Sequence, residues 1–477
     1  MRPNNTLRGE SALFSRAKPY RSTFSGSTLM LNRYAQHQIA SPHRIIIVGG
    51  GAAGLELATR LGNSVGKRRI AEVVLVDRSP TRFWKPLLHE VASGQIDASS
   101  HQIDYASHAK RNRFRFEQGA LSSIERGRHE IIIDETADLE DRTLLSRRTV
   151  QYDTLVLALG SVTNFSSIPG AEQHALTLET VEEAELFRRR ILSGLLRLGQ
   201  QQQNHGTAKT PIAVTVIGGG ATGVKLAAAL RGSAEMIRAC HVASLDPTND
   251  ICIRLIEGAP RVLPALPERI STHAYEVLAG LGVNVRLDCR VRSVNADTIT
   301  TADGEALPSD ITIWAAGVEG PPILRGFEEL PLNRTGRVMV DGELKVEDGA
   351  DIYAMGDCAA CIASTGNAPT PPRAQAAYQQ AVYLADALVR RLDSRVVPSF
   401  SYGDQGTLIS FGRSRAAGAL MSELLKQPLF SNGWLAASCY RHLYHRHIVG
   451  LTGFKRAVMY TVSQWLRDRV RPTVKLN

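Results

Sequence analysis

Two glycine-rich turns of one pattern, 169 residues apart, constrain this chain more than any other feature. Each reads G-x-G-x-x-G and follows a short apolar run, 44–48 in the first copy and 212–217 in the second. The first glycine permits the tight turn, the second lets a pyrophosphate approach the backbone, and the third lets the helix pack on the strand. Two such turns in the same context predict two dinucleotide sites. Their glycines are Gly49, Gly51 and Gly54, and Gly218, Gly220 and Gly223.

An acidic residue ends the strand that follows each turn, Asp77 in "AEVVLVD" and Glu257 in "ICIRLIEG". Each carboxylate can accept hydrogen bonds from a ribose. Glu257 would repel a 2′-phosphate, which favours NADH over NADPH, although Arg254 and Arg261 lie close by in sequence. Two adenine dinucleotides in one chain imply electron transfer between a tightly held flavin and an exchangeable nicotinamide. The alternative is that one of the turns is only a structural bend.

Apolar runs ending in glycine recur along the chain and predict buried parallel strands. A late run, 351–359, ends in Gly356 and Asp357, and we expect Asp357 to reach the ribityl and phosphate region of the flavin; alternatively it caps a turn. A long helix is predicted over 373–391. The other predicted strands are 44–50, 71–77, 152–161, 212–220, 251–258 and 311–318, and a helix is predicted over 52–62.

This pattern predicts an α/β fold with two Rossmann-like dinucleotide-binding domains, as in glutathione-reductase-like flavoproteins, plus a C-terminal membrane-associating region. A chain of 477 residues has room for two or three domains. The expected parts are an N-terminal extension at 1–43, a FAD-binding domain at 44–165 and 326–398, an NADH-binding domain at 166–325, and the C-terminal region at 399–477.

The net charge of +10 is concentrated at the two ends of the chain. Residues 1–44 carry +6 and residues 431–477 carry +7, which leaves −3 between them. No basic stripe with interleaved aromatics crosses a folded domain, so nucleic acid is not an expected partner. Residues 1–42 resemble an organelle transit peptide in composition, or are a disordered or over-extended start before Met30. No apolar run reaches 18 residues, so no transmembrane helix is predicted.

The C-terminal 47 residues predict short basic amphipathic helices that lie on an anionic lipid surface. Apolar residues fall near one face of 434–451 and of 454–466, and basic residues flank the second stretch. An ordinary docking helix or a dimer seam are the alternatives. The two apolar faces contain Trp434, Ala437, Tyr440, Tyr444, Ile448 and Leu451, and Phe454, Ala457, Val458, Val462 and Trp465.

Six cysteines suit a reducing compartment, and no metal site is predicted. Cys358 and Cys361 form a C-x-x-C pair that could be a redox disulfide or a soft-metal pair, but a zinc site would need two more ligands. Residues 1–239 contain no cysteine, which disfavours a flavin disulfide reductase. His442, His445 and His447 are expected to be polar residues at the lipid interface rather than metal ligands.

From residue 44 onward the sequence resembles the type II, non-proton-pumping NADH:quinone oxidoreductases, in their bacterial respiratory NADH dehydrogenase branch. The resemblance rests on "VGGGAAGLELA", "FWKPLLHEVASGQID", "YDTLVLALGS", "VIGGGATGV", "RVLPALPERIS", "WAAGV", "DIYAMGDCA", "PPRAQAAYQQA" and the tail from "GWLAASCYRHLYHRH" to "VRPTVKL". It implies non-covalent FAD on the first turn, NADH on the second and a membrane quinone as acceptor. It also implies a peripheral protein on the cytoplasmic face of a bacterial inner membrane, with a mitochondrial inner membrane less expected and a homodimer possible.

The resemblance also assigns roles to individual residues. Gln375 and Gln379 take the positions of quinone-contacting glutamines, and four residues apart they share one helix face. Lys85, in "WKPLL", and Ala374 match positions along the flavin, and Gly317, in "WAAGV", matches a position at the NADH site. Without the resemblance, an alternative explains the two glutamines equally well: they are exposed polar residues of a helix.

Lys225 breaks the family pattern, because that position is normally glutamate near the meeting point of nicotinamide, flavin and quinone. Lys225 either extends to solvent or, if it faces the flavin, favours its anionic reduced form and alters proton delivery to quinone. We therefore treat it as a catalytic candidate of uncertain role. Alternative functions are an NADH-binding flavoprotein with altered or lost quinone turnover, a flavin disulfide reductase, or a sulfide:quinone oxidoreductase.

Overall fold

A computed structural model of the chain describes the part of the sequence that carries both glycine turns. Residues His43–Asn477 form one compact body. The predicted N-terminal extension, apart from its last residues, lies outside the described residues. Those described are 42–138, 140, 142–205, 211–239, 247–327, 330–347, 351–362, 369–404, 407–410, 416–421, 428–432 and parts of 451–466.

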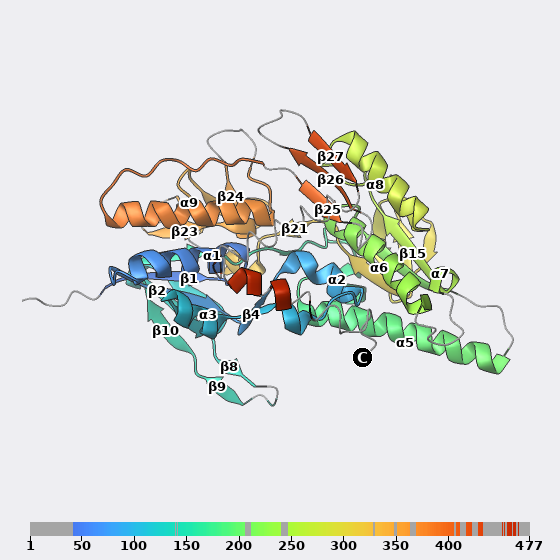
Figure 1. The fold of residues 1–477 in the computed structure, drawn as a ribbon, viewed down its shortest axis with the longest axis horizontal. Helices are drawn as coiled ribbons and strands as arrows, with labels where there is room; N and C mark the ends of the chain where they lie inside the picture. The colour runs from blue at the N-terminus through green and yellow to red at the C-terminus, as the bar shows by residue number, and fades with distance from the viewer. Residues whose placement is uncertain are drawn as a thin grey trace, which may run out of the picture. The chain divides into compact units, whose positions relative to one another are not determined.

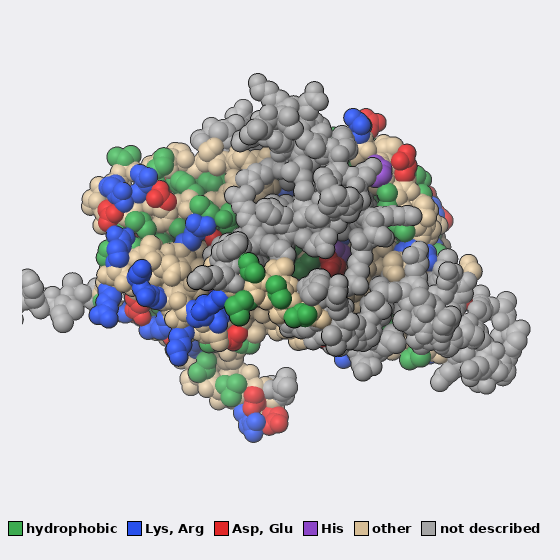
Figure 2. All heavy atoms as spheres, viewed as in Figure 1, with side chains coloured by type: hydrophobic (Ala, Val, Ile, Leu, Met, Phe, Trp, Pro, Cys, Tyr) green, Lys and Arg blue, Asp and Glu red, His purple; other side chains and the backbone are tan. Residues whose placement is uncertain are grey.

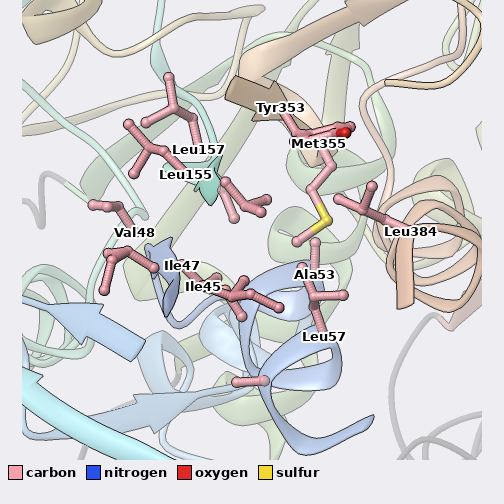
Figure 3. Packing of buried hydrophobic residues seen from close by; sticks show 14 of the residues in the cluster. Ile45, Ile47, Val48, Ala53, Leu57, Leu155, Leu157, Tyr353, Met355 and Leu384 are labelled. Carbon is pink, nitrogen blue, oxygen red and sulfur yellow. The ribbon is translucent and has the colours of Figure 1, made fainter. Parts of the chain in front are cut away.

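The first glycine turn belongs to a parallel five-stranded sheet with the order β23-β11-β1-β2-β5. The apolar run of β1 is buried in the middle of this sheet, as expected of a parallel strand covered on both faces. Helix α1 (Ala52–Leu61) packs against α9 (Ala374–Leu392) (Figure 1), and side chains from both enter the core drawn in Figure 3. The strands are β1 (His43–Val48), β2 (Ala71–Asp77), β5 (Arg115–Gln118), β11 (Thr154–Leu157) and β23 (Ile352–Ala354).

The second turn belongs to another parallel five-stranded sheet, with the order β13-β20-β14-β15-β16. Helix α6 (Ala221–Ala239) follows its turn as α1 follows the first. The strands are β13 (Ala175–Leu176), β14 (Ile212–Ile217), β15 (Ile251–Ile256), β16 (Asn284–Arg286) and β20 (Ile311–Trp314), and the sheet is accompanied by α5 (Val181–His205) and α8 (Glu268–Gly280). The predicted α/β fold with two Rossmann-like units is confirmed.

The two sheets differ in one way that explains the order of the chain. The outer strand β23 is contributed after the whole second sheet, so the first unit is completed only by the late part of the sequence. Two short strands, β12 (Val162–Thr163) and β21 (Val318–Glu319), pair with each other where the chain passes between the two units. Each unit also carries a three-stranded antiparallel sheet, β10-β7-β6 and β17-β18-β19. Their strands are β6 (Leu121–Glu125), β7 (Glu130–Ile133), β10 (Arg148–Gln151), β17 (Val291–Val294), β18 (Thr298–Thr301) and β19 (Ala306–Pro308).

Several strands are shorter than the sequence predicts. The predicted strand at 152–161 is a strand only over Thr154–Leu157, that at 311–318 only over Ile311–Trp314, and that at 351–359 only over Ile352–Ala354 before a 3₁₀ turn. In each case the chain leaves the sheet at its carboxyl edge and turns to line a cavity. This is the edge at which open α/β sheets bind ligands.

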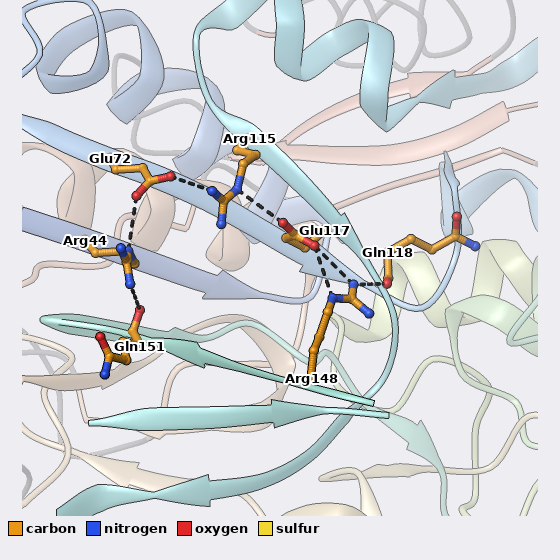
Figure 4. Close-up of polar contacts among 7 residues, drawn as sticks. All are labelled: Arg44, Glu72, Arg115, Glu117, Gln118, Arg148 and Gln151. Carbon is orange, nitrogen blue, oxygen red and sulfur yellow. Dashed lines mark hydrogen bonds and ion pairs between the residues drawn. The ribbon is translucent and has the colours of Figure 1, made fainter. Parts of the chain in front are cut away.

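Charged side chains join the first sheet to its antiparallel attachment (Figure 4). Arg115 pairs with Glu72 at 2.8 Å and with Glu117 at 3.2 Å, and Arg148 on β10 pairs with Glu117 at 3.1 Å. Arg44 completes the row by pairing with Glu72 at 3.1 Å. These residues are partly exposed, so each pair stabilises the fold by about 1 kcal/mol or less.

The C-terminal region contains a three-stranded antiparallel sheet that was not predicted, made of β25 (Thr407–Ser410), β26 (Ala416–Met421) and β27 (Pro428–Asn432). The described parts of 454–466 are helical as predicted, whereas most of 434–451 lies outside the described residues. Two predictions within these stretches are wrong. Leu451 and Ala457 are 1% and 3% exposed and pack inward, so they are not on a lipid-facing surface. No helix among the described residues is long and apolar enough to cross a membrane.

Candidate functional site

A cavity of about 2510 Å³ runs from the first glycine turn to the start of the helix that follows the second. Most of the predicted site residues line this cavity. The predicted residues that do not line it are Gly54, Gly218, Gly220, Gly223 and Glu257. The predicted residues that line it are Gly49, Gly51, Asp77, Lys85, Lys225, Gly317, Gly356, Asp357, Ala374, Gln375 and Gln379.

The first glycine turn has the geometry that a pyrophosphate needs. Gly49 adopts φ +103°, and a Cβ there would collide with the carbonyl of Ala158. A Cβ on Gly54 would collide with the carbonyl oxygen of Gly49, so only glycine lets α1 pack this closely on β1. A Cβ on Gly51 would meet nothing within 4 Å. The helix start therefore faces open space, where free N–H groups and the helix dipole favour an anion.

The second turn repeats this geometry. Gly218 adopts φ +111°, and a Cβ there would lie 2.7 Å from the carbonyl carbon of Ala315. A Cβ on Gly223 would collide with the Gly218 carbonyl oxygen, and one on Gly220 would meet nothing within 4 Å. Both turns thus leave space in front of the second glycine, and the residues present fit two dinucleotide pyrophosphates.

The two acidic residues hold their turns in the same way. The Gly50 N–H donates to Asp77 Oδ2 at 2.5 Å, and the Gly219 N–H donates to Glu257 Oε2 at 2.6 Å. Burial raises the pKa of Asp77, and the hydrogen bond from Gly50 opposes that rise. Each carboxylate keeps acceptor capacity for a ribose hydroxyl, because an ionised carboxylate has about four acceptor positions.

Asp357 lies at the first sheet's carboxyl edge, as the sequence predicts. Burial raises the pKa of its carboxyl, and a hydrogen bond of 3.1 Å from Ser161 Oγ to Oδ2 opposes the rise. Gly356 adopts φ +73°, and its N–H donates to Gln380 Oε1 on α9 at 2.7 Å. Sequence reasoning missed Ser161 as a site residue, although the run "YDTLVLALGS" ends on it.

Lys85 lines the cavity and forms an ion pair that the sequence did not reveal. Its Nζ lies 2.7 Å from Glu179 Oε2, and Thr163 donates to the other oxygen of Glu179 at 2.7 Å. Lys85 is 58% exposed, so the pair adds little stability. Glu179 instead orients the ammonium group at the rim of the cavity.

Lys225 does not extend freely to solvent but is half-buried at the cavity beside His89 and Glu90. Burial lowers the pKa of Lys225, and the charge of Glu90 opposes this. The pKa of the buried His89 is lowered to about 3, first by burial and then by the charge of Lys225. At the equivalent position after the first turn, Glu56 is fully buried and pairs with Arg60 at 2.7 Å. The two helices therefore carry opposite charges at the same place, and only the Glu56 carboxylate is fully buried.

For the activity that the resemblance implies, exchanging Lys225 for glutamate should change quinone turnover by about tenfold, since a charge interaction of about 1.4 kcal/mol corresponds to that factor. The new carboxylate would lie close to Glu90, and this repulsion would raise its pKa. The pH profile of quinone turnover should therefore gain a titration in the acidic range. Lys225→Met, which removes the charge without inverting it, is the matched control, and kinetics unchanged in both variants would contradict a role for Lys225.

Gln375 and Gln379 lie together on α9 at the cavity, as predicted. Their amides also contact the main chain of Gly403, which was not predicted. Gln379 Nε2 donates to the Gly403 carbonyl at 2.7 Å, and Gln375 Nε2 approaches the same oxygen at 3.5 Å.

The C-x-x-C pair has the properties of core residues. Cys358 and Cys361 are fully buried free thiols, and burial raises the pKa of each to about 11. A thiol with a raised pKa is a poor nucleophile and metal ligand. Among the residues that the structure describes, no group of three or more His, Cys, Asp or Glu could hold a metal ion.

Two parallel sheets, each with a dinucleotide-binding glycine turn, define a flavoprotein of the two-dinucleotide class. Residues 43–381 match the family described as pyridine nucleotide-disulphide oxidoreductase, and the chain belongs to that family. Within it, the chain belongs to the type II NADH:quinone oxidoreductases. It is 34% identical over 443 residues to the type II NADH:quinone oxidoreductase of Haemophilus influenzae, covering 91% of this chain and 99% of that protein.

Two further similarities extend the comparison. A type II NADH:quinone oxidoreductase from Staphylococcus aureus is 26% identical over 384 residues, which cover 80% of this chain and 90% of the relative. The solved structure of NDH2 from Plasmodium falciparum in complex with NADH matches with a TM-score of 0.75 at 20% identity. That match covers 91% of this chain and all of the other, and it confirms the fold.

Proposed function

We propose that this type II NADH:quinone oxidoreductase binds FAD at the Gly49–Gly54 turn and NADH at the Gly218–Gly223 turn, and reduces a membrane quinone beside the start of α9. When bound, FAD accepts a hydride from NADH and passes two electrons to the quinone. The observation that carries the proposal is the repeated glycine geometry, in which both second glycines face open space.

At the flavin, the chain's residues bind and orient. The start of α1 faces the pyrophosphate, Asp77 accepts from a ribose hydroxyl, and Asp357 accepts from the ribityl or phosphate region. Gly356 and Ala374 let the backbone approach closely, and Lys85 lies along the flavin. Among these residues, the half-buried carboxyl of Asp357 is held in place by a hydrogen bond from Ser161.

At the nicotinamide cofactor, Gly220 makes room for the pyrophosphate and Glu257 accepts from a ribose hydroxyl. Gly317 lines the shared cavity with φ +83°, a conformation that favours glycine. The negative charge of Glu257 disfavours a 2′-phosphate, which accounts for NADH rather than NADPH.

The quinone is held at α9. Gln375 and Gln379 are neutral, lie one helical turn apart and line the cavity, so they can donate hydrogen bonds to a quinone carbonyl without burying a charge. They line the same cavity as Asp357, the proposed flavin ligand, which suits electron transfer from flavin to quinone.

Gln379→Met should raise the KM for quinone by about tenfold, because one hydrogen bond of about 1.4 kcal/mol is lost. The rate at which NADH reduces the bound flavin should not change. Gln151→Met, on the exposed face of β10, is the control and should match the native enzyme. An unchanged KM for quinone, or an equal loss in flavin reduction, would count against the assignment.

Type II NADH:quinone oxidoreductases are peripheral membrane proteins. We propose that the C-terminal helix contacts an anionic lipid surface through Val458, Met459, Val462 and Leu466, which are 44%, 70%, 50% and 52% exposed. Figure 2 shows hydrophobic side chains next to Lys and Arg side chains where Figure 1 draws the last helical segments. Flotation with anionic vesicles should fail when Val458 and Met459 are replaced by Asp.

We propose that the protein lies on the cytoplasmic face of a bacterial inner membrane. Labelling of membrane vesicles of known orientation tests this location.

We propose domain boundaries near residues 165, 325 and 398, and limited proteolysis tests these boundaries. We propose a homodimer, which the molar mass in detergent tests.

A further inference from the structure

The main chain of Gly403 holds both polar ends of the Gln379 side-chain amide. Gln379 Nε2 donates to the Gly403 carbonyl at 2.7 Å, and the Gly403 N–H donates to Gln379 Oε1 at 3.0 Å. A flipped amide would place oxygen against oxygen and N–H against N–H, so these two bonds fix which way the amide faces.

The segment 398–404 that carries Gly403 is itself fixed to the scaffold. The hydroxyl of Tyr383, on α9, donates to the Pro398 carbonyl at 2.7 Å. Phe400 is buried against the ring of Tyr383, with ring centroids 5.4 Å apart, and its N–H donates to the Gly342 carbonyl at 2.6 Å. Gly403 is therefore presented to Gln379 from a segment anchored at several points.

We propose that Gly403 is a positioning residue for quinone reduction and acts through Gln379. The Gln379 amide nitrogen carries two hydrogens, and Gly403 uses one of them. The side chain lines the cavity, so the second hydrogen is available to a quinone carbonyl there. Because Gly403 has already fixed the amide, little further side-chain freedom is lost when quinone binds. This inference rests on the proposed quinone site.

Gly403→Pro tests the inference, because proline has no N–H to donate to Gln379. The KM for quinone should rise about three- to tenfold, the range expected for one hydrogen bond. The rate of flavin reduction by NADH should stay unchanged, which a general structural defect would not allow. Gly403→Ala is the matched control: it keeps the N–H, and its Cβ would meet nothing within 4 Å, so its KM should stay within about twofold.

The opposite result would overturn the inference. If Gly403 competes with quinone for Gln379, Gly403→Pro will lower the KM, and an unchanged KM contradicts the inference equally. In a Gln379→Met background, Gly403→Pro should have no further effect on the KM for quinone. Additive effects of the two substitutions on this KM would therefore also contradict the inference. If Gly403→Pro does not fold, Tyr383→Phe loosens the same segment and should raise the KM in the same direction. An unchanged KM in Gln379→Met would instead reject the proposed quinone site itself.

Discussion

Replacing Gly51 with valine should give a folded protein that purifies without FAD and does not transfer electrons from NADH to quinone. A Cβ on Gly51 meets no protein atom within 4 Å, so the fold tolerates the side chain. The added methyl groups occupy the space in front of α1, where the pyrophosphate accepts hydrogen bonds from free N–H groups. Losing about 3 kcal/mol of such charge-assisted hydrogen bonding weakens FAD binding about a hundredfold.

The measurement is the ratio of flavin to protein after purification, together with the circular dichroism of the same sample. Gly127→Val is the control, because Gly127 lies in an exposed turn where a Cβ also meets nothing within 4 Å. A Gly51→Val protein that keeps its full flavin content would show that the first turn does not hold FAD.

Replacing Gly220 with valine should have the complementary effect. The same argument applies at the second turn, where the Cβ also faces open space, so the protein should fold and keep its FAD. The KM for NADH should rise about a hundredfold, since the lost contacts are of the same kind. Reoxidation of the reduced flavin by quinone should proceed at the native rate.

Steady-state kinetics with NADH as the varied substrate measure this effect. Gly280→Val, at the end of α8 in the same unit, is the control, because a Cβ there meets nothing within 4 Å. A loss of FAD from Gly220→Val would reverse the assignment of the two turns, and an unchanged KM for NADH with FAD retained would contradict NADH binding at the second turn.

Features that depend on nearby residues were predictable from the sequence. The two turns need glycine at three fixed positions, and Asp77 and Glu257 each end the next strand, so local spacing identifies them. The early helix predicted at 52–62 is α1 (Ala52–Leu61), and the late one predicted at 373–391 is α9 (Ala374–Leu392).

Contacts between distant parts of the chain were not predictable. Ser161 reaches Asp357 across 196 residues, and Lys85 reaches Glu179 across 94. No local pattern marks either partner. The orientation of Leu451 was mispredicted for a related reason: an amphipathic pattern identifies an apolar face but not whether protein or lipid covers it.

The half-buried Lys225 lies between these two cases. The sequence shows that its position departs from the family pattern, but not what compensates for it. The structure places Lys225 beside Glu90 and His89 on a different helix, α2 (Leu88–Ala92). The proximity of Glu90 accounts for a lysine there in physical terms, since its charge opposes the cost of burying the ammonium group.

The central claim, that electrons pass from NADH through bound FAD to quinone, is tested most directly by anaerobic stopped-flow absorbance in two mixing steps. NADH is added first to the FAD-loaded protein, and a soluble quinone is added second. We predict that NADH bleaches the flavin absorbance and that quinone restores it, each at a rate at least as fast as steady-state turnover. A flavin that NADH does not reduce, or that stays reduced after quinone is added, would contradict the account.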